Sequence, residues 1–296
     1  MTEPRLGVVG DMTEDIVVLM GAEFAPGSDT PSRIVRRQGG SAANVAVAAS
    51  SLVATRFYGC VGDDECGDWL ECELAGAMLS TTWEVRLQVS DVAPTGTIVV
   101  LVDAKGERHM FPDRGANTQL LPIEDAQLRE LTALHATAYS LTDEPTAGSV
   151  TAALTTLRDW GRVTSLDVSS TTVIKLIGLE HMLGMLDSLR PTFVMANAAE
   201  AALLGLDVIG ASASYVVLVK RGPGPALVRT RLGAWEVPTT ALEVEDTTGA
   251  GDAFAAGVLA HVINSGLTHE ELLDSGETTA RAFADAGHKA ATAKLR

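Results

Sequence analysis

The sequence predicts an α/β fold in which a mostly parallel sheet is covered by helices on both faces. Short runs rich in β-branched residues recur along the chain, and Ala- and Leu-rich stretches with helical spacing lie between them. The strand runs are almost continuously apolar, as is typical of strands buried on both faces. With 296 residues, 46% of them hydrophobic, we expect one domain spanning residues 1–296, built on one large core with an appendage.

The elements follow in order along the chain. The strand-like runs are 6–9, 97–102, 163–168, 192–195 and 215–219. The helix-like stretches are 42–52, 69–79, 147–160 and 252–264. Two regions break this alternation. Residues 15–38 mix prolines with a cluster of arginines, and residues 82–114 alternate polar and apolar residues around a turn at 104–106. Both are typical of antiparallel hairpins, so we expect them to form a small β lid on the main domain.

Charge and composition exclude several classes. A formal net charge of -16 disfavours nucleic-acid binding, because phosphates would be repelled. The three cysteines, Cys60, Cys66 and Cys72, form no CxxC pair, which favours reduced thiols in the cytoplasm over a disulfide framework or zinc site. No signal peptide is recognisable, and no apolar run approaches the roughly 18 residues of a membrane span.

The chemistry-bearing segment is DTTGAGDAF, residues 246–254. A glycine-rich turn that opens a helix directs several N–H groups at one point and forms a site for an anion such as a phosphoryl group. Asp252 lies inside this turn, where a carboxylate is useful if it accepts a proton from an attacking hydroxyl. An ordinary helix N-cap explains the segment equally well. A dinucleotide fingerprint does not fit, since Phe254 stands where the third glycine should be, and no Walker A sequence is present.

Five motifs together resemble the ribokinase-like (PfkB-type) carbohydrate kinases over essentially the whole chain. They are GGSAANVAVAA (39–49), VGDDECG (61–67), RGAN (114–117), NAAE (197–200) and DTTGAGDAF (246–254). The resemblance implies a three-layer ribokinase-like sandwich and an ATP-dependent kinase that phosphorylates a hydroxyl of a small sugar. It implies ATP and Mg²⁺ as cofactors, with K⁺ as a further cation.

The resemblance assigns roles to particular residues. Asp252 would be the catalytic base, and the backbone N–H groups of Gly249, Ala250, Gly251 and Asp252 would form the anion hole. Asp246 and Thr248 would lie near the monovalent cation. Acceptor contacts would come from Asp11, Asp15, Gly39, Gly40, Asn44, Arg114 and Asn117. For Asp11 a strand-ending cap is as good an interpretation as a substrate contact.

The nucleotide side is assigned in the same way. Asn197 and Glu200 would organise Mg²⁺ and phosphate, largely through water, although an Asn with a Glu three residues later is also a capping pattern. Lys220, Gly222 and Gly224 would form the nucleotide-binding turn, and Gly287, His288 and Ala291 would pack on adenine. The turn departs from the family pattern, because Pro225 stands about where the second glycine is expected, and the chain stops at Arg296 without the usual Gly-containing tail.

Several alternatives stay open at this stage. Ribokinases proper tend to carry a lysine in the first signature, and this chain does not, so the sequence does not establish ribose as the acceptor. A nucleoside acceptor would need aromatic stacking, for which Phe24, Trp83 and Phe111 are available, and an acidic or phosphorylated sugar would need arginines, of which Arg114 is the best placed. A non-catalytic sugar sensor on the same fold is a rival from another class. Relatives often pair through their lids, which implies a homodimer.

Overall fold

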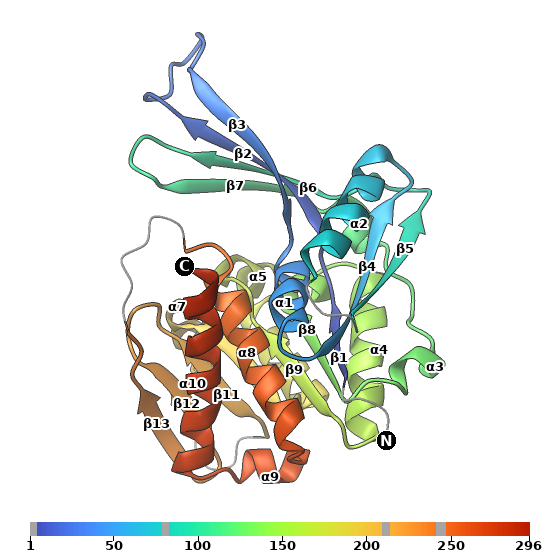
Figure 1. Ribbon diagram of the computed structural model, residues 1–296, viewed down its shortest axis with the longest axis vertical. Helices are drawn as coiled ribbons and strands as arrows, with labels where there is room; N and C mark the ends of the chain where they lie inside the picture. Colours follow the sequence, from blue (N-terminus) through green and yellow to red (C-terminus); the bar gives the residue numbers. More distant parts are fainter. Residues whose placement is uncertain (1–4, 79–82, 209–213, 241–246) are drawn as a thin grey trace.

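A computed structural model describes residues 5–78, 83–208, 214–240 and 247–296. These residues form a nine-stranded sheet and a separate four-stranded sheet, with helices packed on both faces of the larger one (Figure 1). The strands of the larger sheet, in spatial order, are β13 (Gly233–Val237), β12 (Ala226–Thr230), β11 (Val216–Lys220), β10 (Phe193–Asn197), β9 (Val163–Asp167), β8 (Ala133–Thr137), β1 (Arg5–Val9), β4 (Ala54–Gly62) and β5 (Glu84–Ser90).

Strands β11 to β5 in this order pair in parallel, and β12 and β13 add an antiparallel edge. Side chains alternate between two apolar cores, so that Leu6 and Val8 of β1 face one core and Val9 faces the other. The first core lies under α1 (Ser41–Ser50), α2 (Glu65–Ala77), α8 (Ala250–Ser265), α9 (His269–Leu273) and α10 (Glu277–Lys294). The second lies under α3 (Asp125–Leu128), α4 (Thr146–Asp159), α5 (Thr171–Ile177), α6 (Leu179–Leu189) and α7 (Ala198–Leu204). This confirms the predicted three-layer α/β sandwich.

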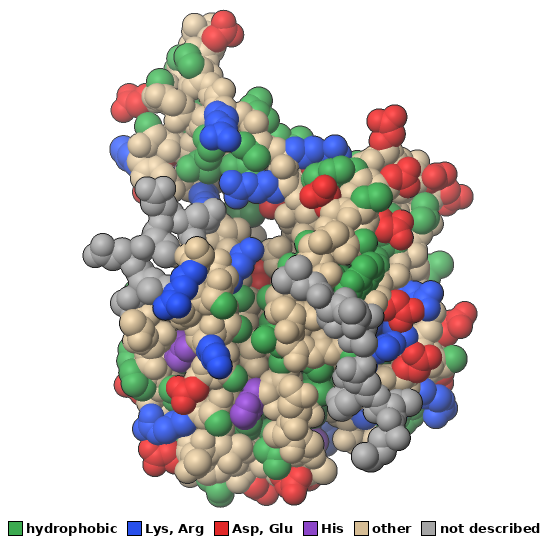
Figure 2. Space-filling view, in the orientation of Figure 1, with side chains coloured by type: hydrophobic (Ala, Val, Ile, Leu, Met, Phe, Trp, Pro, Cys, Tyr) green, Lys and Arg blue, Asp and Glu red, His purple; other side chains and the backbone are tan. Residues whose placement is uncertain are grey.

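The four-stranded sheet projects from one end of the sandwich (Figure 1). Its order is β3 (Ser32–Gly39), β2 (Thr13–Met20), β6 (Thr97–Val102) and β7 (Arg108–Asp113). The outer pairs are antiparallel and the central pair, β2 with β6, is parallel. Figure 2 shows hydrophobic side chains, with Lys and Arg among them, on the side of this sheet that it presents.

The boundaries expected for the small sheet need one correction. The segment 82–114 was expected to form it throughout, but β5 pairs in parallel with β4 at seven positions and extends the large sheet instead. Polar alternation in β5 comes from its place at the edge of the large sheet, where one face is exposed. Only β6 and β7 from this segment enter the projecting sheet, joined at the turn that contains Gly106.

Within the described ranges, none of the helices combines the length and the hydropathy that crossing a bilayer requires. The short helical turn η1 (Gly115–Thr118) lies next to β4, and η2 (Ala138–Leu141) lies next to β8.

Candidate active site

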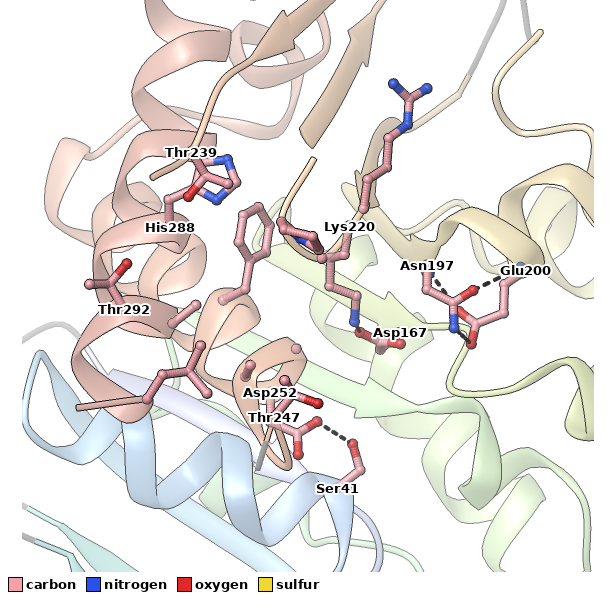
Figure 3. A pocket seen from close by; sticks show the side chains of 18 of the residues that line it. Ser41, Asp167, Asn197, Glu200, Lys220, Thr239, Thr247, Asp252, His288 and Thr292 are labelled. Atoms are coloured by element: carbon pink, nitrogen blue, oxygen red, sulfur yellow. Dashed lines mark hydrogen bonds and ion pairs between the residues drawn. The ribbon is translucent and has the colours of Figure 1, made fainter. Parts of the chain in front are cut away.

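A cavity of about 520 Å³ opens at the carboxyl ends of β9, β10 and β11 (Figure 3). Polar side chains from these strand ends converge with the first turns of α1 and α8. Ligands of open parallel sheets bind at this edge, because the loops after the strands are free to surround them. The polar residues that line the cavity include Ser41, Asp167, Asn197, Glu200, Lys220 and Asp252.

Asp252 lies in the first turn of α8 and is held by two donors from α1. Ser41 Oγ donates to its Oδ1 at 2.7 Å, and Asn44 Nδ2 donates to its Oδ2 at 3.0 Å. Burial raises the pKa of Asp252, while the Ser41 bond, the charge of Lys220 and the Asn44 bond oppose that rise. The carboxylate is therefore fixed in orientation, and its pKa is raised above that of an exposed aspartate.

Fewer backbone N–H groups are free to bind an anion than the four that were predicted. Gly249 adopts a left-handed conformation, φ 77°, immediately before α8. The Ala250 N–H donates to the Thr247 carbonyl at 3.2 Å, so it is already engaged. The N–H groups of Gly251 and Asp252 have no acceptor among the residues that the structure describes. These two groups, at the positive end of the α8 dipole, remain able to receive an anion.

Lys220, the last residue of β11, brings a cation to the same point. Its ammonium group pairs with the Asp167 carboxylate at the end of β9. A Cβ at position 251 would lie 3.5 Å from Lys220 Nζ, so the ammonium is adjacent to the α8 N-terminus. Burial lowers the pKa of Lys220, but the Asp167 carboxylate outweighs it and the net shift is upwards. Lys220 is thus a fixed positive charge in the cavity.

Asn197 and Glu200 form a capping box at the start of α7. Glu200 Oε2 accepts from the Asn197 N–H at 2.8 Å, and its Oε1 accepts from Asn197 Nδ2. Both side chains nevertheless line the cavity, and burial raises the pKa of Glu200. The capping interpretation and the site interpretation therefore apply to the same two residues.

The expected nucleotide residues lie at the outer part of the cavity. Gly222 lines it, and the Gly224 N–H closes the turn by donating to the Arg221 carbonyl at 3.0 Å. His288 and Ala291 of α10 also line it, and His288 packs edge-on to Phe254 with ring centroids 5.3 Å apart. Gly287 faces the Phe254 ring, where a Cβ would approach to 2.6 Å.

The expected acceptor residues lie outside the lining of this cavity, beside the junction of β1, β2 and β3. Two glycines are required there. A Cβ at Gly39 would lie 2.1 Å from Asp15 Oδ1, and one at Gly40, where φ is 94°, would lie 2.3 Å from the Asp11 carbonyl oxygen. Burial raises the pKa of Asp15, although a hydrogen bond from Thr13 opposes the shift.

Asp11 and Arg114 neutralise each other. The Arg114 guanidinium donates to both Asp11 oxygens at 2.8 Å, in a bidentate pair. Arg114 Nη1 also donates to Asp143 Oδ2 at 2.7 Å and to Thr142 Oγ1 at 2.6 Å. One arginine therefore serves two carboxylates, and most of its donors are engaged.

Asn117 is fully engaged with the backbone. Its Oδ1 accepts from the Met12 N–H at 2.9 Å, and its Nδ2 donates to the carbonyls of Met12 and Arg114, each at 3.0 Å. The side chain is 3% exposed. It holds the β1–β2 junction and offers no free group to an acceptor.

Of the two residues predicted to lie near the monovalent cation, the structure describes only Thr248. Asp246 lies outside the described residues. The Thr248 hydroxyl accepts a hydrogen bond from the Arg108 guanidinium of β7. This bond joins the projecting sheet to the loop that carries the α8 N-terminus.

Sequence reasoning assigned no role to Ser41, Asp167 or Asp143, and it considered Arg108 only among the arginines that an acidic sugar would need. Ser41 lies inside the motif at 39–49, and Asp167 lies inside the strand-like run at 163–168. A signal did exist for Asp167, because it ends one of the parallel strands whose carboxyl edge forms the site.

Comparisons with known proteins identify the family of this chain. The family model described as "pfkB family carbohydrate kinase" matches residues 4–291. An aminoimidazole riboside kinase of Salmonella typhimurium is 25% identical, over 98% of this chain and 90% of its own. An ATP-dependent ribose-1-phosphate kinase of Halopiger xanaduensis is 30% identical, over 77% and 74%. The crystal structure of a fructokinase with bound ATP from Xylella fastidiosa superimposes with a TM-score of 0.79 at 23% identity, covering 99% of this chain and 92% of the other. The chain belongs to the pfkB family of carbohydrate kinases.

Proposed function

We propose that this kinase transfers the γ-phosphoryl group of ATP to a hydroxyl of a small neutral sugar, with Asp252 as the base. The observation that carries the proposal is the position of Asp252. Its carboxylate is clamped by Ser41 and Asn44, beside Lys220 and the free N–H groups of the α8 N-terminus. A proton acceptor and a phosphate-binding site thus occupy one point, as in-line phosphoryl transfer requires.

In the proposed step the acceptor hydroxyl gives its proton to an Asp252 carboxylate oxygen. The hydroxyl oxygen forms a bond to the γ-phosphorus as the bond to the ADP oxygen breaks, and Asp252 then returns the proton to solvent. The N–H groups of Gly251 and Asp252, with the Lys220 ammonium, stabilise the charge on the phosphoryl oxygens. Asn44 and Ser41 must loosen their hold or share Asp252 with the acceptor, so they position the base.

The donor set fits Mg²⁺ held through water. Asp167 and Glu200 offer carboxylate oxygens, the ligand type that Mg²⁺ prefers, and both line the cavity. Both carboxylates already accept hydrogen bonds, Asp167 from Lys220 and Ser169, and Glu200 from Asn197. Since Mg²⁺ usually keeps several waters, these residues would hold it in that form, and it would neutralise phosphate charge.

For K⁺ the support is the family resemblance of the segment that contains Asp246 and Thr248. Arg108 already brings a positive charge to Thr248. A K⁺ requirement would appear as loss of turnover when potassium chloride is replaced by tetramethylammonium chloride at equal ionic strength.

The acceptor is proposed to be neutral because the positive charge of Arg114 is already compensated by carboxylates of the protein. Its bidentate bond to Asp11 and its bond to Asp143 leave the site with at least as much negative as positive charge. An acidic or phosphorylated sugar would meet repulsion from both carboxylates. Asp11 and Asp15 suit hydroxyl donors instead. A nucleoside is the second candidate, favoured by the similarity to a riboside kinase.

The projecting sheet is proposed to act as the lid. Arg108 and Asp15 share one face of it. Asp15 pairs with Ile98, and Arg108 pairs with Val102. Ile98 and Val102 are four residues apart on β6, so their side chains point to the same face. This face carries both the acceptor contact and the bond to Thr248. Closure over the acceptor would exclude water from the transfer centre.

The opposite face of the lid is proposed to pair with a second copy of the chain. Ile34 and Phe111 lie on it and are 67% and 55% exposed. Register places further apolar side chains on the same face, namely Ile16, Val18, Val99 and Leu101. The same register places Glu14 and Arg36 on this face as well. Exposed apolar side chains grouped in this way are typical of an interface. A cytoplasmic location fits the three free cysteines, Cys60, Cys66 and Cys72.

Asp252→Asn tests the proposal. It keeps the size of the side chain and removes the base, so we expect kcat to fall by about 10²–10⁴-fold with the fold retained. The assay couples ADP release to NADH oxidation, with fructose, ribose, a nucleoside, a sugar acid and ribose 1-phosphate as acceptors. Near-normal turnover in the variant would refute Asp252 as base. Sugar binding by calorimetry without any ADP release in the unaltered protein would favour a sensor instead.

A further inference from the structure

A second pocket lies at the opposite end of the large sheet from the active site. It has a volume of about 300 Å³ and is formed where α4 and α6 end, where β11 begins, at the β12–β13 turn and at the start of α9. Asn197 and Lys220 of the active site lie at the carboxyl ends of β10 and β11, whereas this pocket lies beyond their amino ends. Five residues of strand, roughly 16 Å, separate the two sites. In Figure 1 this end is marked by α9, and the projecting sheet lies at the other end.

Three arginines converge on this pocket, which we call the basal pocket: Arg158, Arg190 and Arg231. Two carboxylates, Asp159 and Glu270, share the lining, so positive charges outnumber negative ones inside it. Asp274 adds a longer contact to Arg231, at 3.5 Å. This concentration of arginine occurs in a chain whose formal net charge is -16, where acidic surroundings are the rule.

The arginines differ in how far they are engaged. Arg158 Nη1 donates to the carbonyls of Ser188 and Leu189, at 2.7 and 3.1 Å, and so caps the end of α6. Arg231 uses Nη1 for Glu270 and Asp274. The Arg190 N–H donates to the Leu186 carbonyl at 2.9 Å, but its guanidinium has no hydrogen bond or ion pair with any residue that the structure describes. Donors of two arginines, Arg190 and Arg231, are therefore available to a ligand.

The backbone at Arg190 is unusual. It is the C-cap of α6 in the left-handed region, with φ 41°, a position at which glycine or asparagine is normally found. A left-handed conformation is unfavourable for an arginine. Among the described residues the guanidinium has no partner, which is expected if its partner is a ligand.

His269 completes the basal pocket. Its Nδ1 lies 2.9 Å from Thr192 Oγ1, which leaves Nε2 towards Glu270, at 4.0 Å. Burial lowers the pKa of His269; Glu270 opposes this shift, and the charges of Arg231, Arg190 and Arg158 add to it. The imidazole therefore experiences all three guanidinium groups at once. An anion bound among these guanidinium groups would offset their positive charge at the imidazole and so favour the protonated ring.

We propose that the basal pocket binds a phosphoryl-bearing anion, either inorganic phosphate or a small phosphate monoester. Guanidinium groups match the tetrahedral oxygens of phosphate with paired N–H donors, and the pocket volume suits a ligand of this size. Asp159 and Glu270 do not close it, because their side chains are 61% and 69% exposed and can turn to solvent. Exposed ion pairs contribute little, so a dianion can displace them.

The proposal is tested by NMR of the six histidine rings during titration with sodium phosphate. His269 reports on the basal pocket, and His288, which lines the active-site cavity, reports on binding there. His269→Gln and His288→Gln assign the two signals. We expect a saturable shift of the His269 signal and a rise in its pKa. In Arg190→Gln the affinity reported by His269 should fall about tenfold or more, the loss expected for one charge-assisted hydrogen bond, while the His288 response stays unchanged.

Arg33→Gln on β3 is the matched control, since it removes one exposed arginine from the other end of the molecule. A shift of His269 that does not saturate, or that is the same in Arg190→Gln, would overturn the proposal. Thermal unfolding gives an independent measure, because a ligand that binds only the folded state raises Tm. Phosphate should raise Tm less in Arg190→Gln than in Arg33→Gln; equal effects contradict the proposal. Repeating the titration with glycerol 3-phosphate identifies the source, as tighter binding of the monoester indicates a phosphorylated metabolite and tighter binding of phosphate indicates the free ion.

Discussion

Ser41→Ala should move the acidic limb of the pH–rate profile to higher pH. Ser41 Oγ donates to Asp252 Oδ1 at 2.7 Å and favours the ionised carboxylate. A hydrogen bond to a charged group contributes about 1.5–3 kcal/mol, so its loss disfavours the ionised carboxylate by that amount and raises the pKa of Asp252 further. The base must be deprotonated to act, so activity then falls at a higher pH than in the unaltered enzyme. Alanine is a good helix former, and α1 should persist.

The assay is kcat/KM for the acceptor between pH 4 and 8, because this ratio reports the pKa of the essential base in the enzyme without bound substrate. Ser51→Ala is the matched control. Its hydroxyl donates to the Ala48 carbonyl at the other end of α1 and is far from Asp252, so the limb should not move. An unshifted limb in Ser41→Ala, accompanied by a uniform loss of rate at all pH values, would show that the limb reports another group.

Three further predictions concern stability and assembly. Lys220→Met leaves the Asp167 carboxylate, 7% exposed, without its cation, and we expect urea unfolding to show a loss of about 3–5 kcal/mol; an unchanged midpoint would mean that the pair is not formed. Burial lowers the pKa of His135 to about 4. Between about pH 6.5 and pH 4 the unfolded chain therefore binds a proton that the folded chain does not. The free energy of unfolding falls as the pH decreases through that window, by up to about 1.4 kcal/mol per pH unit. His135→Val should flatten this part of the curve relative to the unaltered protein. Ile34→Glu places a charge on the exposed lid face, and light scattering after size exclusion should detect a monomer where the unaltered chain is a dimer, whereas the same mass for both would contradict the lid interface.

Much of the large sheet could be predicted because its strands are apolar on both faces. The runs at 163–168, 192–195 and 215–219 became β9, β10 and β11 with shifts of one or two residues. Four strands of this sheet were missed, namely β4, β8, β12 and β13. In β4 and β8 the reason is a polar residue that argues against burial. Arg56 is buried in β4 only because Glu84 and Glu130 pair with it, and His135 is buried in β8 next to Ser165. Those partners are distant in sequence, so the sequence pattern could not reveal them.

The site shows the same division. The motif at 246–254 identified Asp252, whose environment is consistent with the role expected of it. Asn117 and Arg114 were predicted to contact the acceptor, but their donors and acceptors are engaged with Met12, Asp11 and Asp143. Whether a polar side chain is free or engaged depends on tertiary neighbours. Sequence motifs therefore located the site better than they described the bonds within it.

The bond between Ser41 and Asp252 joins residues 211 positions apart, and it has a consequence for how such enzymes diversify. The proposed base Asp252, its clamp Ser41 and the cation Lys220 come from the ends of α8, α1 and β11. The residues proposed to surround the acceptor follow β1, lie on β2 or precede the turn η1. Substitutions in the second group can alter which molecule is accepted while the phosphoryl-transfer apparatus stays intact. We therefore expect substitutions in the second group to change acceptor preference with less effect on phosphoryl transfer than substitutions in the first.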